Sequence, residues 1–110
     1  MTDKIRNVLD EVYEERQRQL QKWGVQDHPQ GTGPEVELFG FTIQEMTSFV
    51  KSFNDEHNNP FWGTILLEEV LEALSEREGA PELRKELIQV AAVAVAAVEN
   101  LDARNNEEAA

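Results

Sequence analysis

The stretch from Leu87 to Val98 most constrains the fold, because its only polar side chain is Gln89. A helix through such a run is apolar on every side, so it must be covered by other helices or by other subunits. The run is about 12 residues long, whereas a helix needs roughly 20 apolar residues to span a bilayer. We therefore expect a core or interface helix, a homo-oligomer, and no membrane contact.

Helical periodicity predicts two helices in the first half of the chain. The first is capped by Thr2 and ends at Trp23, with Gly24 as its stop. Residues 25–40 are rich in glycine and proline and are expected to form an ordered loop. Thr42-Ile43-Gln44-Glu45 has the form of a capping box, which predicts a second helix up to Phe53, followed by a turn at 54–59.

The second half predicts two further helices. Asn59 as cap and Pro60 as first residue open a helix that runs to Glu78, and the last helix runs from Pro81 to about Arg104. No alternating strand pattern occurs, so the expected class is all-α, an antiparallel bundle of about four helices. We expect a single domain over residues 1–104 with an acidic tail over 105–110.

Composition excludes several classes of function. The 22 acidic and 10 basic residues give a formal charge of −12, which argues against binding to nucleic acid or anionic membranes. The absence of cysteine excludes disulfides, thiolate zinc sites and cysteine nucleophiles. The first residues show no apolar signal-peptide region, and we expect a cytoplasmic protein.

The helix predicted over residues 60–78 carries a stripe of acids opposite a leucine-rich face. At about 100° per residue, Glu69, Glu72 and Glu76 fall in a narrow arc with Glu68 at its edge. Like charges at this spacing repel one another, and no Lys or Arg follows in the stripe until Arg77. A solvated acidic surface is the ordinary interpretation of such a stripe, and a cation site is the alternative.

The short connection at residues 79–81 forces the last two helices to lie antiparallel and adjacent. Glu86 is then level with Glu72, and Gln89 is level with Glu69, so four oxygen-bearing side chains can converge. A carboxylate beside an apolar helix needs a partner, and the expected neighbours are further acids rather than bases. A divalent cation would satisfy them.

The chemical types of the candidate ligand atoms restrict which cation could bind. Oxygen ligands without His or Cys select Mg²⁺, Mn²⁺ or Ca²⁺. A di-iron centre would use Glu-x-x-His pairs, but neither His28 nor His57 has a carboxylate three residues before it. Magnesium held by a few carboxylates keeps positions for water and phosphate oxygens, which indicates phosphate-ester or anhydride chemistry.

Two motifs carry a family resemblance. Leu67-Glu68-Glu69-Val70-Leu71-Glu72, a spacer of 13 residues and Glu86-Leu87-Ile88-Gln89 resemble the EExxE and ExxD pattern of the MazG-like, all-α nucleoside triphosphate pyrophosphohydrolases. Three further segments, 15–29, 62–67 and 89–95, are similar to the actinobacterial and phage branch of that superfamily. The resemblance covers most of the chain, up to about Leu101.

The resemblance implies hydrolysis of a nucleoside triphosphate to a monophosphate and pyrophosphate. Its cofactor would be Mg²⁺, with Mn²⁺ as a substitute. The apolar last helix indicates a homo-oligomer, either a dimer or a tetramer. Glu68 would support the site or orient the attacking water. The implied metal ligands are Glu69, Glu72, Glu86 and Gln89, and the implied catalytic residues are Glu68, Glu69, Glu72 and Glu86.

A second group of residues could bind the substrate. Lys22 would meet phosphate, while Trp23, Gln26 or His28 would contact the base, and Gln19 shares the face of Lys22. The alternative is that Lys22 is a solvated cation and Trp23 a hydrophobic plug.

Two other functions stay open at this point. Gln89 stands where the family pattern has Asp, and a neutral amide oxygen coordinates more weakly, so the chain could bind nucleotides without hydrolysing them. The acidic charge and small size also fit an interaction protein that mimics nucleic acid.

Overall fold

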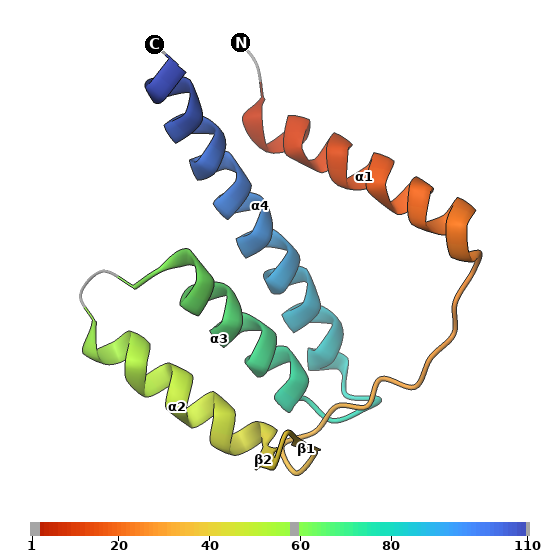
Figure 1. The fold of residues 1–110 in the computed structure, drawn as a ribbon. Helices are drawn as coiled ribbons and strands as arrows, with labels where there is room; N and C mark the ends of the chain where they lie inside the picture. Colours follow the sequence, from red (N-terminus) through yellow and green to blue (C-terminus); the bar gives the residue numbers. More distant parts are fainter. Residues whose placement is uncertain (1–2, 58–59, 110) are drawn as a thin grey trace. The chain divides into compact units, whose positions relative to one another are not determined.

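The computed structural model describes residues 3–57 and 60–109, and this part of the chain is all-α as predicted. A short antiparallel strand pair precedes the second helix. The elements are α1 (Lys4–Trp23), β1 (Glu37–Leu38), β2 (Phe41–Thr42), α2 (Ile43–Glu56), α3 (Trp62–Ser75) and α4 (Pro81–Ala109) (Figure 1).

The chain forms two compact units, Met1–Pro29 with Val95–Ala110, and Gln30–Ala94. In the first unit, α1 begins at an N-cap formed by Asp3, whose carboxylate accepts the Arg6 N–H at 3.0 Å. Thr2, the predicted cap, lies outside the described residues. Gly24 ends α1 as predicted, with a φ of 68° and its N–H donating to the Leu20 carbonyl.

The second unit begins with a loop that is tied to the end of α3. The N–H of buried Gly33 donates to the Leu74 carbonyl at 2.8 Å, which satisfies one of the free carbonyls in the last turn of α3. Arg77, which follows α3, forms a bidentate ion pair with Glu35. The loop predicted for residues 25–40 is therefore ordered by contacts with a helix end.

The strand pair β1–β2 was not predicted. Its turn consists of Phe39 and Gly40, which both have positive φ values, 56° and 85°, as a type I′ hairpin turn requires. Two residues per strand are too few to give a visible alternation in the sequence.

The capping box at the start of α2 is confirmed. The Thr42 hydroxyl accepts the Glu45 N–H at 3.1 Å, and the Glu45 carboxylate accepts the Thr42 N–H at 3.0 Å. The predicted turn after Phe53 is wrong at its start, because α2 continues through Asn54 to Glu56. This extension adds another helical turn that faces α3.

The predicted bounds of α3 need correction at both ends. The helix begins at Trp62 after Phe61 rather than at Pro60, and the proposed cap Asn59 lies outside the described residues. It ends at Ser75 because Glu76 has an extended backbone, with a ψ of 137°. Glu76 therefore does not belong to the helical acid stripe.

The predicted arrangement of the helical hairpin is observed. Within the second unit, α2 runs antiparallel to α3, and α3 runs antiparallel to the first part of α4 (Figure 1). The buried apolar side chains of this unit are Ile43, Leu71, Ala73 and Leu83.

The last helix is longer than predicted. It continues past Arg104 to Ala109, so the segment expected to be a frayed acidic tail is largely helical. No glycine or proline follows Pro81 in the chain, so no strong helix breaker interrupts α4. Within the described ranges, no helix is both long and apolar enough to cross a membrane.

Candidate metal centre

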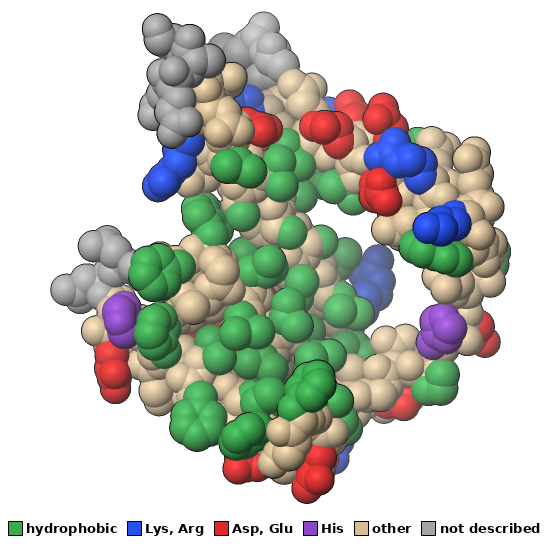
Figure 2. Space-filling model, in the orientation of Figure 1, with side chains coloured by type: hydrophobic (Ala, Val, Ile, Leu, Met, Phe, Trp, Pro, Cys, Tyr) green, Lys and Arg blue, Asp and Glu red, His purple; other side chains and the backbone are tan. Residues whose placement is uncertain are grey.

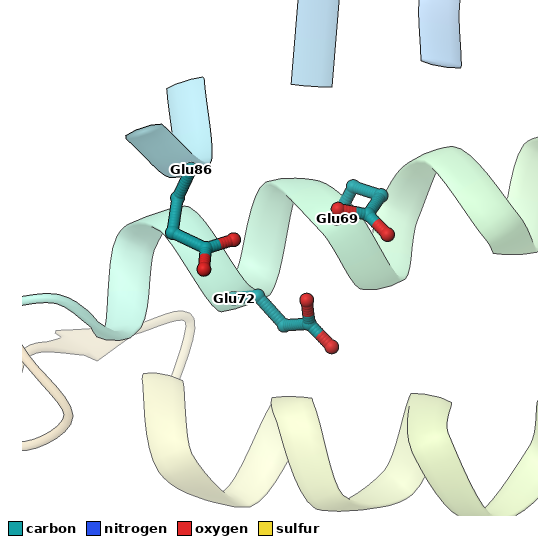
Figure 3. Close-up of side chains that lie close together, drawn as sticks. All are labelled: Glu69, Glu72 and Glu86. Atoms are coloured by element: carbon teal, nitrogen blue, oxygen red, sulfur yellow. The ribbon is translucent and has the colours of Figure 1, made fainter. Parts of the chain in front are cut away.

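Three carboxylates from two helices meet in the second unit. Glu69 and Glu72 extend from α3, and Glu86 extends from α4 (Figure 3). One oxygen from each of the three lies within 4.8 Å of the others. We call Glu69, Glu72 and Glu86 the carboxylate triad. The structure thus brings together three of the four donors that the sequence placed at one point.

Two oxygens of the triad are buried without a partner. Glu69 Oε2 and Glu86 Oε2 are inaccessible to solvent and accept no hydrogen bond from the described part of the chain. A buried carboxylate oxygen without a donor is costly, because it has lost water and gained nothing in exchange. A proton or a cation would complete the triad.

The pKa of Glu69 reflects the same unfavourable burial. Burial raises the pKa of Glu69 above the ordinary 4.5, and the charges of Glu72, Glu86 and Glu68 raise it further. Lys51 acts in the opposite direction. A dication in the triad would favour the ionised carboxylate and so act against this rise in the pKa of Glu69.

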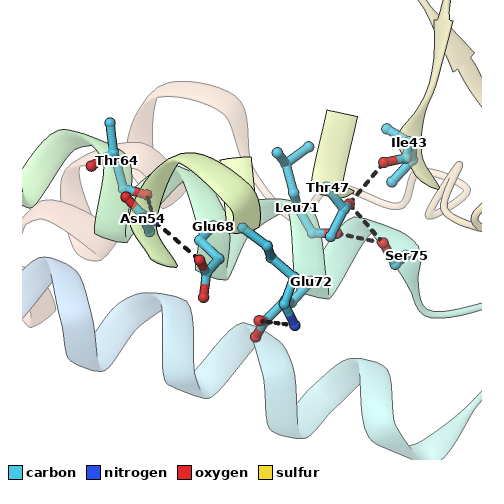
Figure 4. Close-up of polar contacts among 9 residues, drawn as sticks. Ile43, Thr47, Asn54, Thr64, Glu68, Leu71, Glu72 and Ser75 are labelled. Atoms are coloured by element: carbon cyan, nitrogen blue, oxygen red, sulfur yellow. Dashed lines mark hydrogen bonds and ion pairs between the residues drawn. The ribbon is translucent and has the colours of Figure 1, made fainter. Parts of the chain in front are cut away.

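Helix α2 supplies polar partners to α3, contrary to the expectation of acids alone. Lys51 Nζ lies 3.5 Å from Glu72 Oε1. Asn54 Nδ2 donates to Glu68 Oε1 at 3.0 Å, and the Thr47 and Ser75 hydroxyls are 3.2 Å apart (Figure 4). We call these three contacts the α2–α3 polar seam.

The sequence carries a signal for the polar seam. Thr47, Lys51 and Asn54 follow one another at spacings of four and three, so they share one face of a helix. A helix that ends at Phe53 leaves Asn54 in a turn. Extending that helix by one turn places Asn54 on the same face as Thr47 and Lys51.

Glu68 differs from the triad in its surroundings. Asn54 donates from one amide group both to the Glu68 carboxylate and to the Thr64 carbonyl, each at 3.0 Å. Asn54 therefore fixes the Glu68 side chain to the α2 side of α3, and Glu68 is not a member of the triad. Its role as a supporting group stays a prediction.

Gln89 is half-buried on α4, three residues after Glu86. This spacing puts the two side chains on the same face of the helix. Its assignment as a fourth ligand stays a prediction.

The predicted substrate-binding residues belong to the other unit. Gln19, Lys22 and Trp23 lie on α1, and Gln26 and His28 lie in the exposed segment that follows it. Gln19 accepts a hydrogen bond from Arg16, and the Lys22 ammonium lies 5.0 Å from the centre of the exposed Trp23 ring. Their contact with a substrate stays a prediction.

Comparisons with protein-family models, with curated proteins and with solved structures found no match to the chain.

The raised pKa of Glu69 predicts how stability depends on pH. The folded state holds this proton more tightly than the unfolded chain does, so acidification from neutral pH towards 4.5 should relieve the strain and stabilise the fold. Glu69→Gln should stabilise the metal-free protein near neutral pH by a few tenths of a kcal/mol per like-charge neighbour, and should flatten this pH dependence. Urea unfolding in the presence of a chelator measures both effects. Glu82→Gln, at an exposed position in the first turn of α4, is the matched control; equal curves for the two variants would contradict the prediction.

Removing the Asn54 amide should destabilise the second unit. Asn54→Ala deletes two hydrogen bonds that join α2 to α3, which should lower the free energy of unfolding by about 1–3 kcal/mol. Asp55→Ala changes the neighbouring exposed residue and should have little effect. Chemical denaturation of both variants measures the difference, and an unchanged midpoint for Asn54→Ala would show that the seam contributes nothing.

Proposed function

We propose that this protein is a Mg²⁺-dependent nucleotide pyrophosphohydrolase that cleaves a nucleoside or deoxynucleoside triphosphate to the monophosphate and pyrophosphate, with Mn²⁺ as an alternative cation. The observation that carries the proposal is the carboxylate triad, in which two buried oxygens lack a hydrogen-bond partner among the described residues. The nucleotide as substrate rests on the EExxE and ExxD-like motifs in the sequence, since no compared protein supports it.

The donors of the triad fit a hard dication. All are carboxylate oxygens, which Mg²⁺ and Mn²⁺ accept readily, and soft ligands are absent from the group. Glu69, Glu72 and Glu86 would hold the cation, together with the amide oxygen of Gln89. When bound, the cation supplies charge neutralisation and Lewis-acid polarisation of a phosphate group.

The remaining chemistry falls to residues of α2 and α3. Glu68 would accept a proton from the attacking water or orient it, because a carboxylate fixed by Asn54 at one oxygen presents its second oxygen in a defined direction. Phosphoryl chemistry asks a protein mainly for positioning and charge compensation. A chain with a formal charge of −12 would repel a free triphosphate, so the cation must enter before the substrate or with it.

The activity test is a panel of common NTPs and dNTPs, with and without Mg²⁺ or Mn²⁺, in which the products are identified. We expect release of pyrophosphate and a monophosphate from at least one substrate, only with metal. Glu72→Gln should abolish turnover and the rise in melting temperature that metal produces. Glu68→Gln should lower kcat by roughly 10²–10⁴-fold without abolishing metal binding.

Two further variants sharpen this test. Glu82→Gln makes the same chemical change at an exposed position of α4 and should behave as wild type. Gln89→Asp should raise turnover if the amide weakens the centre. The wild-type protein could bind metal without hydrolysing any nucleotide, while Gln89→Asp hydrolyses one. That result would assign the chain to nucleotide binding rather than catalysis. Absence of metal binding altogether would contradict the proposal.

We also propose that the protein is a homo-oligomer. Hydrophobic side chains gather on the visible surface of the second unit (Figure 2). The exposed hydrophobic side chains of this unit include Ile88 on α4, which is 57% exposed, and Phe49 on α2, which is 68% exposed. Extended apolar surface of this kind marks sites of association in soluble proteins. A second copy of the chain is the partner that the apolar run of α4 requires.

Light scattering after size-exclusion chromatography should give the mass of a dimer or a tetramer at micromolar concentration. Ile88→Glu should shift the protein towards the monomer, because a charge at a buried apolar interface is costly. Arg84→Glu, at an exposed position one turn earlier on α4, is the control for an added acid. A monomeric wild-type protein would refute the proposal.

A further inference from the structure

Lys51 is the cation of the polar seam, and its contact with the triad is loose. The 3.5 Å between Lys51 Nζ and Glu72 Oε1 is longer than the 2.7–2.9 Å or so of a tight charge-assisted hydrogen bond. The Lys51 side chain is 53% exposed, whereas that of Glu72 is 28% exposed. The ammonium therefore approaches the triad from solvent on a flexible stem and is not locked in place.

The contact nevertheless balances charge in the triad. Glu72 is a member of the triad, and the Lys51 charge also counteracts the repulsion that Glu69 experiences. Among the described residues, Lys51 is the basic side chain that forms an ion pair with a triad carboxylate. Arg77, the first basic residue after α3, forms an ion pair with Glu35.

We infer that Lys51 is a resident counter-ion of the triad, which a divalent cation displaces from Glu72 when it binds. The inference rests on the metal centre proposed above and adds a determinant of its affinity. A dication and an ammonium compete for the same carboxylate, and they also repel each other when both are near it. Lys51 is thus a positioning residue that stabilises the metal-free state and weakens metal binding.

The inference predicts a gain of affinity from a loss of charge. Lys51→Met keeps an unbranched side chain that is one atom shorter and removes the competing ammonium, so the protein should bind Mn²⁺ roughly two- to fivefold more tightly, as expected for losing one exposed ion pair. The same variant should have a lower melting temperature in a chelator and a larger rise of that temperature on adding Mn²⁺. A merely structural role of Lys51 would lower stability without tightening metal binding.

Two control variants isolate the position of the charge. Lys51→Arg keeps a cation at the site and should not tighten metal binding. Lys4→Met removes one positive charge on α1, in the other unit, and reports the effect of net charge alone.

Titration calorimetry with Mn²⁺, without nucleotide, separates this inference from the proposed function. Tighter binding in Lys51→Met than in Lys4→Met supports it, even if no nucleotide is hydrolysed. Equal or weaker binding in Lys51→Met overturns it while leaving the metal centre in place. No binding to any variant removes both the centre and the inference.

Discussion

Repulsion among the carboxylates of α3 and α4 is the constraint to which the second unit responds. The short connection between these helices brings Glu86 beside Glu69 and Glu72, and buries one oxygen each of Glu69 and Glu86 without a donor. Such an arrangement costs stability unless it is neutralised. Burial of apolar side chains in this unit, among them Leu71 and Leu83, offsets this cost. A cluster that opposes its own fold in this way is typical of functional sites.

Helix α2 moderates the repulsion without removing it. The polar seam gives Glu72 an ammonium and Glu68 an amide, while the two buried triad oxygens receive neither. The groups of α2 therefore offset the charges of Glu68 and Glu72 and leave the buried oxygens of Glu69 and Glu86 without compensation. Glu72 belongs to both groups, because it contacts Lys51 in the polar seam and lies in the triad.

The sequence predicted the parts that depend on local chemistry. The capping box at Thr42, the stop at Gly24 and the helical hairpin that aligns Glu72 with Glu86 each follow from a few neighbouring residues. The missed features depend on where an element ends. Asn54 could face α3 only because α2 runs to Glu56, and Glu76 left the acid stripe because the backbone turns after Ser75. No local motif in the sequence marks these two helix ends, and the end of α3 has a tertiary contact between Gly33 and Leu74.

The neutral side chain of Gln89 bears on the number of cations that the proposed centre would hold. Once a dication has displaced Lys51 from Glu72, the three carboxylates of the proposed centre carry three negative charges, and one dication would leave one of them uncompensated. An Asp at position 89 would add a fourth carboxylate beside the triad, on the same face of α4 as Glu86, and would increase the repulsion in the metal-free state. The neutral amide keeps an oxygen donor there without this cost. The proposed centre would therefore hold a single cation, with three acids and one amide as its ligands.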